Sequence, residues 1–209
     1  MKLNSQVRIA HDPAGNPRIS TFSPELWPTE KSFTATRNSP NADRLSAPLS
    51  PEASARTLTL DWQCLLDGPR QVFGIAPGEE QRFTIAPDGF VAQQLDLDGL
   101  FIRRKSHKFL IVFHGALDRE KFILPRFEYQ RALKEFDGSI LFLQDPTLYV
   151  HKQLTLGWYI GNSVDNAHCM IKQLINIATD VLQPKQVLLT GSSGGGFAAL
   201  AISARIPQS

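Results

Sequence analysis

Apolar residues in the second half of the chain recur at two different periods, which predict alternating strands and helices. Continuous apolar runs at 109–113, 139–143 and 186–190 are typical of strands buried on both faces of a parallel sheet. Residues 164–182 carry apolar side chains three and four positions apart, which predicts a helix capped by Ser163 or Asp165 and followed by Pro184. A shorter amphipathic pattern predicts a helix over 127–136. We therefore expect strand–helix units throughout 107–209.

The first half of the chain has a different pattern. Leu58, Leu60 and Trp62 alternate with polar residues, and 82–85 and 100–103 are further short strand candidates separated by turn residues. Residues 56–106 are therefore expected to form antiparallel strands. Residues 1–55 are rich in Pro, Ser and Asn and form a polar extension, with a hairpin expected from 7–10 and 19–22. The predicted fold is of the α/β class, a mostly parallel sheet with flanking helices, preceded by these antiparallel strands.

Composition narrows the class of protein. The chain has 209 residues, 42% hydrophobic and 20% charged, as in soluble globular proteins. A net charge of +2 is too small to indicate a nucleic-acid partner, and the apolar runs are too short to span a membrane. Cys64 and Cys169 both lie in apolar segments and outside any Cys-x-x-Cys motif, which predicts reduced thiols and no metal site. Since the N-terminus also lacks the apolar core of a signal peptide, we expect a cytoplasmic protein.

The strongest chemical signal follows the last predicted strand, where a Gly-Ser-Ser-Gly-Gly-Gly run leads into a helix of small residues. Ser193 is the serine in this run that has glycines both two positions before and two positions after it, at Gly191 and Gly195. A serine on a tight strand-to-helix turn brings strand and helix so close that a β-carbon at either of those positions would clash. The helix N-terminus then faces any negative charge that develops beside Ser193. The pattern indicates acyl-transfer chemistry.

Other interpretations of the glycine run remain open. It could be a turn that only lets a helix pack closely on a sheet. It could also bind phosphate, because a strand, glycines and a helix N-terminus suit a dinucleotide. The dinucleotide spacing fails, however, since Ser193 and Ala199 stand where glycines are needed, and no Lys-Ser or Lys-Thr follows.

Residues 57–205 resemble a serine hydrolase of the α/β-hydrolase fold that stops just after its nucleophile helix, and more loosely little-described bacterial hydrolase-like proteins. The resemblance rests on the elbow, on Phe113-His114-Gly115-Ala116 after the strand 109–113, and on the Asp145-Pro146 and Gly157-Trp158-Tyr159 segments. It implies Ser193 as nucleophile and an oxyanion hole of backbone N–H groups from Gly194 and from Gly115 or Ala116, with His114 orienting its loop. The implied reaction is hydrolysis of a small-molecule carboxylic ester, or acyl transfer, through an acyl-serine without a cofactor.

Two further segments of the resemblance are ambiguous. Asp145 either lines the substrate pocket or caps the turn that follows it. Trp158 and Tyr159 either form a recognition surface in the pocket or pack over the sheet edge.

One departure from the family concerns the base. In this fold the acid and the histidine follow the nucleophile, yet residues 194–209 contain no His, Asp or Glu. All the histidines precede Ser193: His11, His107, His114, His151 and His168. The chain is therefore expected to be a fragment that lacks the acid and the histidine of the triad. The alternative is a non-catalytic binding module on a degenerate hydrolase fold.

Overall fold

The computed structural model describes residues 9–11, 17–19, 57–87 and 94–206, and the chain divides into two units, 1–48 and 49–209. In the first unit, β1 (Ile9–His11) pairs antiparallel with β2 (Pro17–Ile19). This pairing confirms the predicted hairpin, with strands shifted by about two residues from those expected. The other features expected within 1–55 lie outside the described residues.

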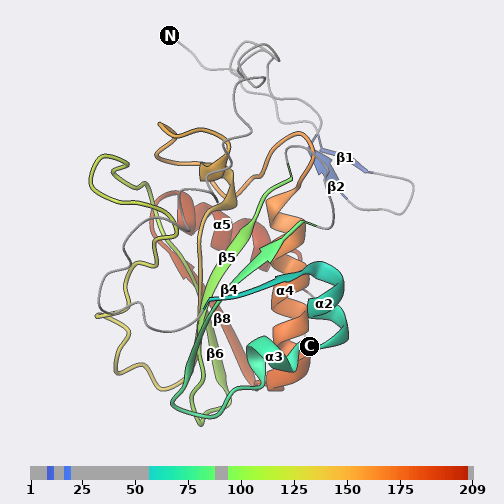
Figure 1. Ribbon diagram of the computed structural model, residues 1–209, viewed down its shortest axis with the longest axis vertical. Coiled ribbons are helices and arrows are strands. Elements are labelled where there is room, and N and C mark those ends of the chain that lie inside the picture. The colour runs from blue at the N-terminus through green and yellow to red at the C-terminus, as the bar shows by residue number, and fades with distance from the viewer. Residues whose placement is uncertain (1–8, 12–16, 20–56, 88–93, 207–209) are drawn as a thin grey trace. The chain divides into compact units, whose positions relative to one another are not determined.

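The second unit contains a six-stranded sheet with the order β3-β4-β5-β7-β6-β8 (Figure 1). Strand β5 runs antiparallel to β4 and β7, and the remaining neighbours are parallel. The sheet is thus mixed and mostly parallel, and with its helices it confirms the α/β class. Its strands are β3 (Leu58–Asp61), β4 (Glu80–Ala86), β5 (Leu97–Ile102), β6 (Lys108–Phe113), β7 (Ser139–Leu143) and β8 (Gln186–Gly191).

The expectation that 56–106 is antiparallel throughout is wrong at its first strand. Strand β3 pairs parallel with β4, because α2 (Trp62–Asp67) and α3 (Arg70–Phe73) carry the chain back to the starting end of the sheet. Asp61 begins α2 by accepting a hydrogen bond from the Cys64 N–H at 2.6 Å. Helices of six and four residues are too short to show a helical period in the sequence.

The helices pack on one face of the sheet, and the sheet's other face is covered differently. Besides α2 and α3, the helical face carries α4 (Ala167–Leu182) and α5 (Gly194–Ser203), which share one apolar core with the strands (Figure 1). On the opposite face, Phe127 packs against a smaller cluster formed by alternate residues of β5, β6 and β7. No helix among the described residues is long and apolar enough to cross a bilayer.

The predicted helix over 127–136 is wrong, because this segment forms successive turns. Tyr129 has a φ of 68°, in the left-handed region that interrupts an α-helix. The hydrogen bonds that follow also change period: Leu133 N–H donates to the carbonyl four residues back, and Phe136 N–H to the carbonyl three residues back. The amphipathic pattern reflects a segment that places Phe127 in the core without forming a helix.

The long helix α4 starts slightly later than predicted. Its N-cap is Asn166, whose side chain accepts a hydrogen bond from the Cys169 N–H, and neither Ser163 nor Asp165 serves as the cap. Both cysteines are free, and Cys64 is exposed although its segment is apolar in the sequence. A short 3-10 helix, η3 (Pro146–Tyr149), follows β7.

Candidate active site

Three strand ends meet at one edge of the sheet and supply the loops of the candidate site. Phe113, the last residue of β6, is paired with Leu143 at the end of β7 and with Gly191 at the end of β8. Because these strands are parallel, the loops that follow them leave the sheet at the same edge. Strands β7 and β8 lie on opposite sides of β6. This arrangement creates a switch point, where open α/β sheets bind their ligands.

Ser193 lies on the turn between β8 and α5, in a conformation that ordinary residues avoid. Its φ of 52° and ψ of −120° lie outside the regions favoured by L-residues, and its side chain is exposed. A β-carbon on Gly191 would lie 2.4 Å from the carbonyl carbon of Gly195. One on Gly195 would lie 2.5 Å from the carbonyl oxygens of Phe113 and His114. Both glycines are therefore sterically required, for the reason that the sequence indicated.

Backbone N–H groups are available on both segments that flank Ser193. A β-carbon on Gly115 would lie 3.6 Å from the Ser193 β-carbon, so the 114–116 loop borders the turn directly. The N–H groups of Gly115 and Ala116 have no hydrogen-bond partner within the described part of the chain, and neither has that of Gly194. Gly194 is the first residue of α5, where N–H groups lack intrahelical partners. These groups could stabilise negative charge beside Ser193.

His114 holds the loop after β6 in place. Its buried ring accepts a hydrogen bond at Nε2 from the Asp145 N–H at 3.0 Å, so the proton resides on Nδ1, which donates to the Gly115 carbonyl oxygen at 2.7 Å. Burial lowers the pKa of His114 to about 4, which keeps the ring neutral near pH 7. Both ring nitrogens are occupied, so His114 orients its loop and has no free position for proton transfer to Ser193.

Of the two interpretations left open for Asp145 and Tyr159, burial favours the structural one: Asp145 caps the turn that follows it, and Tyr159 is packed inside the fold. Asp145 is buried, and its carboxylate accepts hydrogen bonds from the N–H groups of Thr147 at 3.0 Å, Gly157 at 3.1 Å and Tyr159 at 3.2 Å. Burial raises the pKa of Asp145, and these bonds oppose the rise. The hydroxyl of the fully buried Tyr159 accepts from the His114 N–H at 2.8 Å and donates to the Leu143 carbonyl at 3.1 Å. Both side chains therefore hold the backbone of the loops around the turn in place through hydrogen bonds.

Trp158 contributes to an apolar side of the candidate site. It is 43% exposed and packs edge-on against Phe197 of α5, with ring centroids 5.6 Å apart. Leu156 covers the start of α5, because a β-carbon on Gly194 would lie 2.3 Å from its Cδ1. The sequence analysis missed Phe197 and Leu156. Phe197 lies one helical turn after Ser193, a spacing that could have identified it, whereas nothing in the pattern marks Leu156.

Tyr129 forms a hydroxyl pair next to the turn and was also missed. Its hydroxyl lies 2.6 Å from the Ser192 Oγ. The two residues are 63 positions apart in the chain, and the pattern around Tyr129 predicted a helix, so the sequence held no signal for this contact.

No histidine or carboxylate of the described residues forms a hydrogen bond with Ser193. His151 accepts the Gln153 N–H at its own Nδ1. The His168 Nε2 lies 3.4 Å from the Trp158 carbonyl oxygen, and its ring centroid lies 6.1 Å from that of Phe197. Burial lowers the pKa of His168, with the charge of Arg205 adding to the effect. The described part of the chain thus holds a serine and free N–H groups without a base in contact.

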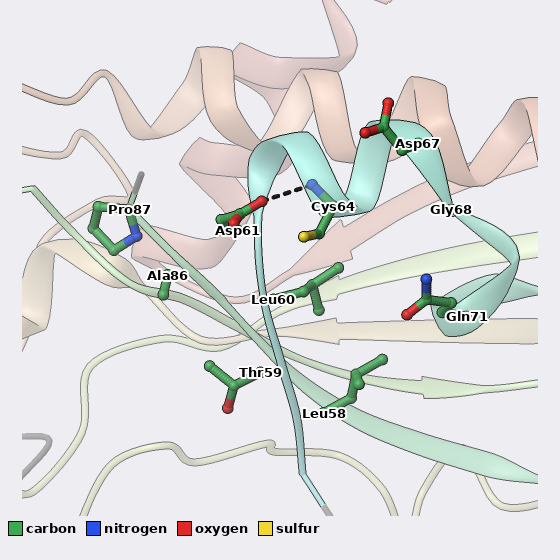
Figure 2. A pocket seen from close by; sticks show the side chains of 10 residues that line it. All are labelled: Leu58, Thr59, Leu60, Asp61, Cys64, Asp67, Gly68, Gln71, Ala86 and Pro87. Carbon is green, nitrogen blue, oxygen red and sulfur yellow. Dashed lines mark hydrogen bonds between the residues drawn. The ribbon is translucent and has the colours of Figure 1, made fainter. Parts of the chain in front are cut away.

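A groove of about 590 Å³ lies along β3 and α2 (Figure 2). Strand β3 is the outermost strand of the sheet on the side away from β8, so this groove is separate from the turn at Ser193. Its candidate nucleophile is the exposed thiol of Cys64. The Asp61 carboxylate raises the pKa of that thiol, first through a side-chain hydrogen bond and then through its charge, which disfavours the reactive thiolate. The described residues also contain no group of three or more His, Cys, Asp or Glu side chains that could hold a metal ion. The turn at Ser193 is therefore the better candidate for chemistry.

The chain was compared with protein families, with curated proteins and with solved structures. No protein-family model matches the chain, and no curated protein does either. Among solved structures, an esterase of Pyrococcus furiosus aligns over 64% of this chain, with 17% sequence identity and a TM-score of 0.39. The aligned region covers 46% of that esterase, so this chain spans about half of its length.

Proposed function

We propose that the protein is a serine hydrolase in which Ser193 is the nucleophile for hydrolysis of a small carboxylic ester, or for transfer of its acyl group. The observation that carries this proposal is the backbone of Ser193, held at φ 52° between two required glycines and bordered by unpaired N–H groups. Such strain persists only where the surrounding structure imposes it, and it is concentrated at functional sites.

The proposed reaction proceeds through an acyl-serine. The Ser193 Oγ attacks the ester carbonyl carbon and gives up its proton to a base, while the carbonyl π electrons move onto oxygen. The N–H groups of Gly194 and of Gly115 or Ala116 donate to this oxyanion, and each such donor is typically worth about 10²–10³ in rate. Collapse of the intermediate expels the alcohol, which takes up a proton. Water or a second hydroxyl then releases the acyl group. Because backbone donors polarise the carbonyl, the mechanism uses no metal or organic cofactor.

Ser193 also needs a general base, because an unactivated serine hydroxyl is a weak nucleophile. We propose that a histidine and its carboxylate partner come from outside the described residues. His114 is unsuited to the role, because its two nitrogens are engaged with Gly115 and Asp145. In this proposal the chain supplies the nucleophile and the oxyanion hole of a larger site.

The test uses the native protein, as its own cell makes it, with two independent measurements. Hydrolysis of 4-nitrophenyl acetate gives the turnover, and intact mass after treatment with a fluorophosphonate reports a covalent serine adduct. We expect Ser193→Ala to lose the adduct and to lower kcat by at least about 10³-fold, as for other serine nucleophiles. Ser203→Ala, which removes an exposed hydroxyl at the other end of α5, should retain both. Full esterase activity in Ser193→Ala would contradict the proposal.

A second candidate function is a non-catalytic binding module built on the same fold. The observation that favours it is the lack of any described histidine or carboxylate in contact with Ser193. A native protein that neither hydrolyses the ester nor forms the adduct would support this function over the first.

A further inference from the structure

The Tyr129 and Ser192 hydroxyls lie together beside the proposed nucleophile. Their oxygens are 2.6 Å apart, and Ser192 directly precedes Ser193. A β-carbon on Gly115 would lie 3.1 Å from the Ser192 Oγ, so the pair stands next to the loop that supplies the proposed oxyanion donors. Tyr129 is 40% exposed and Ser192 is also exposed, which leaves both hydroxyls accessible to a ligand.

Tyr129 is held in its position by the surrounding backbone. Its φ of 68° is unfavourable for a residue with a β-carbon. The segment before it is anchored, because the Arg126 N–H donates to the side-chain oxygen of the buried Gln144 at 2.7 Å and Phe127 packs in the core. The segment after it is fixed by the Leu133 N–H, which donates to the Tyr129 carbonyl at 3.0 Å. A half-exposed aromatic residue held at a positive φ, beside the turn that carries the proposed nucleophile, is typical of a functional site.

The pair has unused hydrogen-bonding capacity. Two hydroxyls carry two O–H donors, and the bond between them uses one, so one donor and several lone pairs remain. Neither hydroxyl has a further partner within the described residues. Apolar side chains pack beside the same turn, with Leu156 against Gly194 and Trp158 against Phe197. The surroundings of Ser193 therefore include both polar and apolar side chains.

We propose that Tyr129 and Ser192 form a binding subsite for a hydroxyl group of the substrate, so that the enzyme prefers esters with a hydroxyl near the reacting carbonyl over plain alkyl esters. This inference rests on the proposed role of Ser193 for its biological meaning, but the subsite itself binds ligand without any reaction. A ligand hydroxyl both donates to the pair and accepts from it, which a methyl group of the same size cannot do.

The test measures binding of slowly reacting amides by ligand-detected NMR, in pairs that differ only by OH against CH₃. One pair is N-(2-hydroxyethyl)butyramide and N-propylbutyramide. The other is N-propyl-3-hydroxybutyramide and N-propyl-3-methylbutyramide. We expect the native protein to bind the hydroxylated member of at least one pair about tenfold more tightly, the ratio expected when one net hydrogen bond is lost. The pair that shows the preference identifies the acyl or the alcohol portion.

Variants separate this subsite from the nucleophile and from a purely structural contact. Tyr129→Phe and Ser192→Ala should each reduce the ratio to within about twofold while keeping the affinity for the methyl-bearing ligand. Ser193→Ala and the control Ser203→Ala should keep the tenfold ratio. A native protein that binds neither pair, or binds both members equally, would overturn the subsite, as would a preference that survives both Tyr129→Phe and Ser192→Ala. An active Ser193→Ala would instead overturn the proposed function alone.

Discussion

At the scale of single residues, Gly195 shows how closely the turn at Ser193 is packed. Its missing β-carbon would meet three backbone atoms of Phe113 and His114 within 2.8 Å, and backbone of a central strand cannot move aside. We expect Gly195→Ala to lower the free energy of unfolding by about 3 kcal/mol, the upper range for overpacking. Denaturant titration of the variant and the native protein measures this loss.

Gly196→Ala is the matched control, because it adds the same methyl one residue later. Its nearest contact, the Gly191 carbonyl oxygen, lies at 3.2 Å, a distance that a shift of a few tenths of an ångström relieves. We expect a change within about 1 kcal/mol, since alanine also favours the helix. Equal stability of the two variants would show that the turn is not as tightly packed as described.

These residue-scale features differ in how far the sequence could predict them. The requirement for Gly191 and Gly195 follows from local geometry, because a strand, a strained serine and a helix within a few residues leave room for hydrogen alone. The contact of Tyr129 with Ser192 depends on how two distant loops meet, and no local pattern contains that information. The same holds for Asp145, which the sequence placed at the right strand end while its burial among backbone N–H groups was visible only in three dimensions.

At the scale of elements, the start of α4 provides a test of capping. Asn166 Oδ1 accepts the Cys169 N–H at 3.1 Å, which satisfies one of the free N–H groups of the first turn. Asn166→Ala should therefore lower the free energy of unfolding by about 1 kcal/mol. The control is Ser163→Ala, a residue that the sequence favoured as a cap and that is exposed outside the helix. Thermal unfolding of both variants tests this assignment. A greater loss of stability in Ser163→Ala than in Asn166→Ala would contradict it.

Elements with a strong period were predictable, and short ones were not. The strand β7 matches its expected range, and β6 and β8 are each one residue longer than expected. A short continuous apolar run between turn residues is typical of a buried strand, which is why these three were predictable. Helices α2 and α3 are too short to show a helical period in the sequence. The turns at 129–136, in contrast, carry apolar residues at a helical spacing without forming a helix. In that segment the left-handed backbone of Tyr129 decides the structure, and sequence periodicity does not report it.

At the scale of the whole sheet, strand order brings the site together. Alternating strands and helices predict a parallel sheet, but they do not specify that β6 lies between β7 and β8. That order places the loops starting at His114, at Gln144 and at Ser192 side by side. The proposed nucleophile and the oxyanion donors come from two of these loops, and the buried Asp145 on the third fixes the ring of His114.

The burial of His114 makes the stability of the sheet depend on pH. The folded pKa of about 4 lies below the ordinary 6.5, so between these values the unfolded chain binds a proton that the folded chain does not. The contribution of His114 is therefore complete above pH 6.5 and is lost as the pH falls toward 4. Between pH 7 and pH 5 the loss should be about 2 kcal/mol.

Denaturant titrations of the native protein, His114→Gln and His151→Gln at pH 7, 6 and 5 test this dependence. The raised pKa values of Asp145 and Asp165 act in the opposite direction, and the lowered pKa of His168 acts in the same direction. All three groups remain in both variants, so the difference between the variants isolates His114. We expect His114→Gln to be less stable at pH 7 but to lose about 2 kcal/mol less on acidification, while His151→Gln, at an exposed position, follows the native protein. Parallel pH curves for all three proteins would mean that the ring of His114 takes up a proton as readily in the folded chain as in the unfolded chain, which would contradict the lowered pKa.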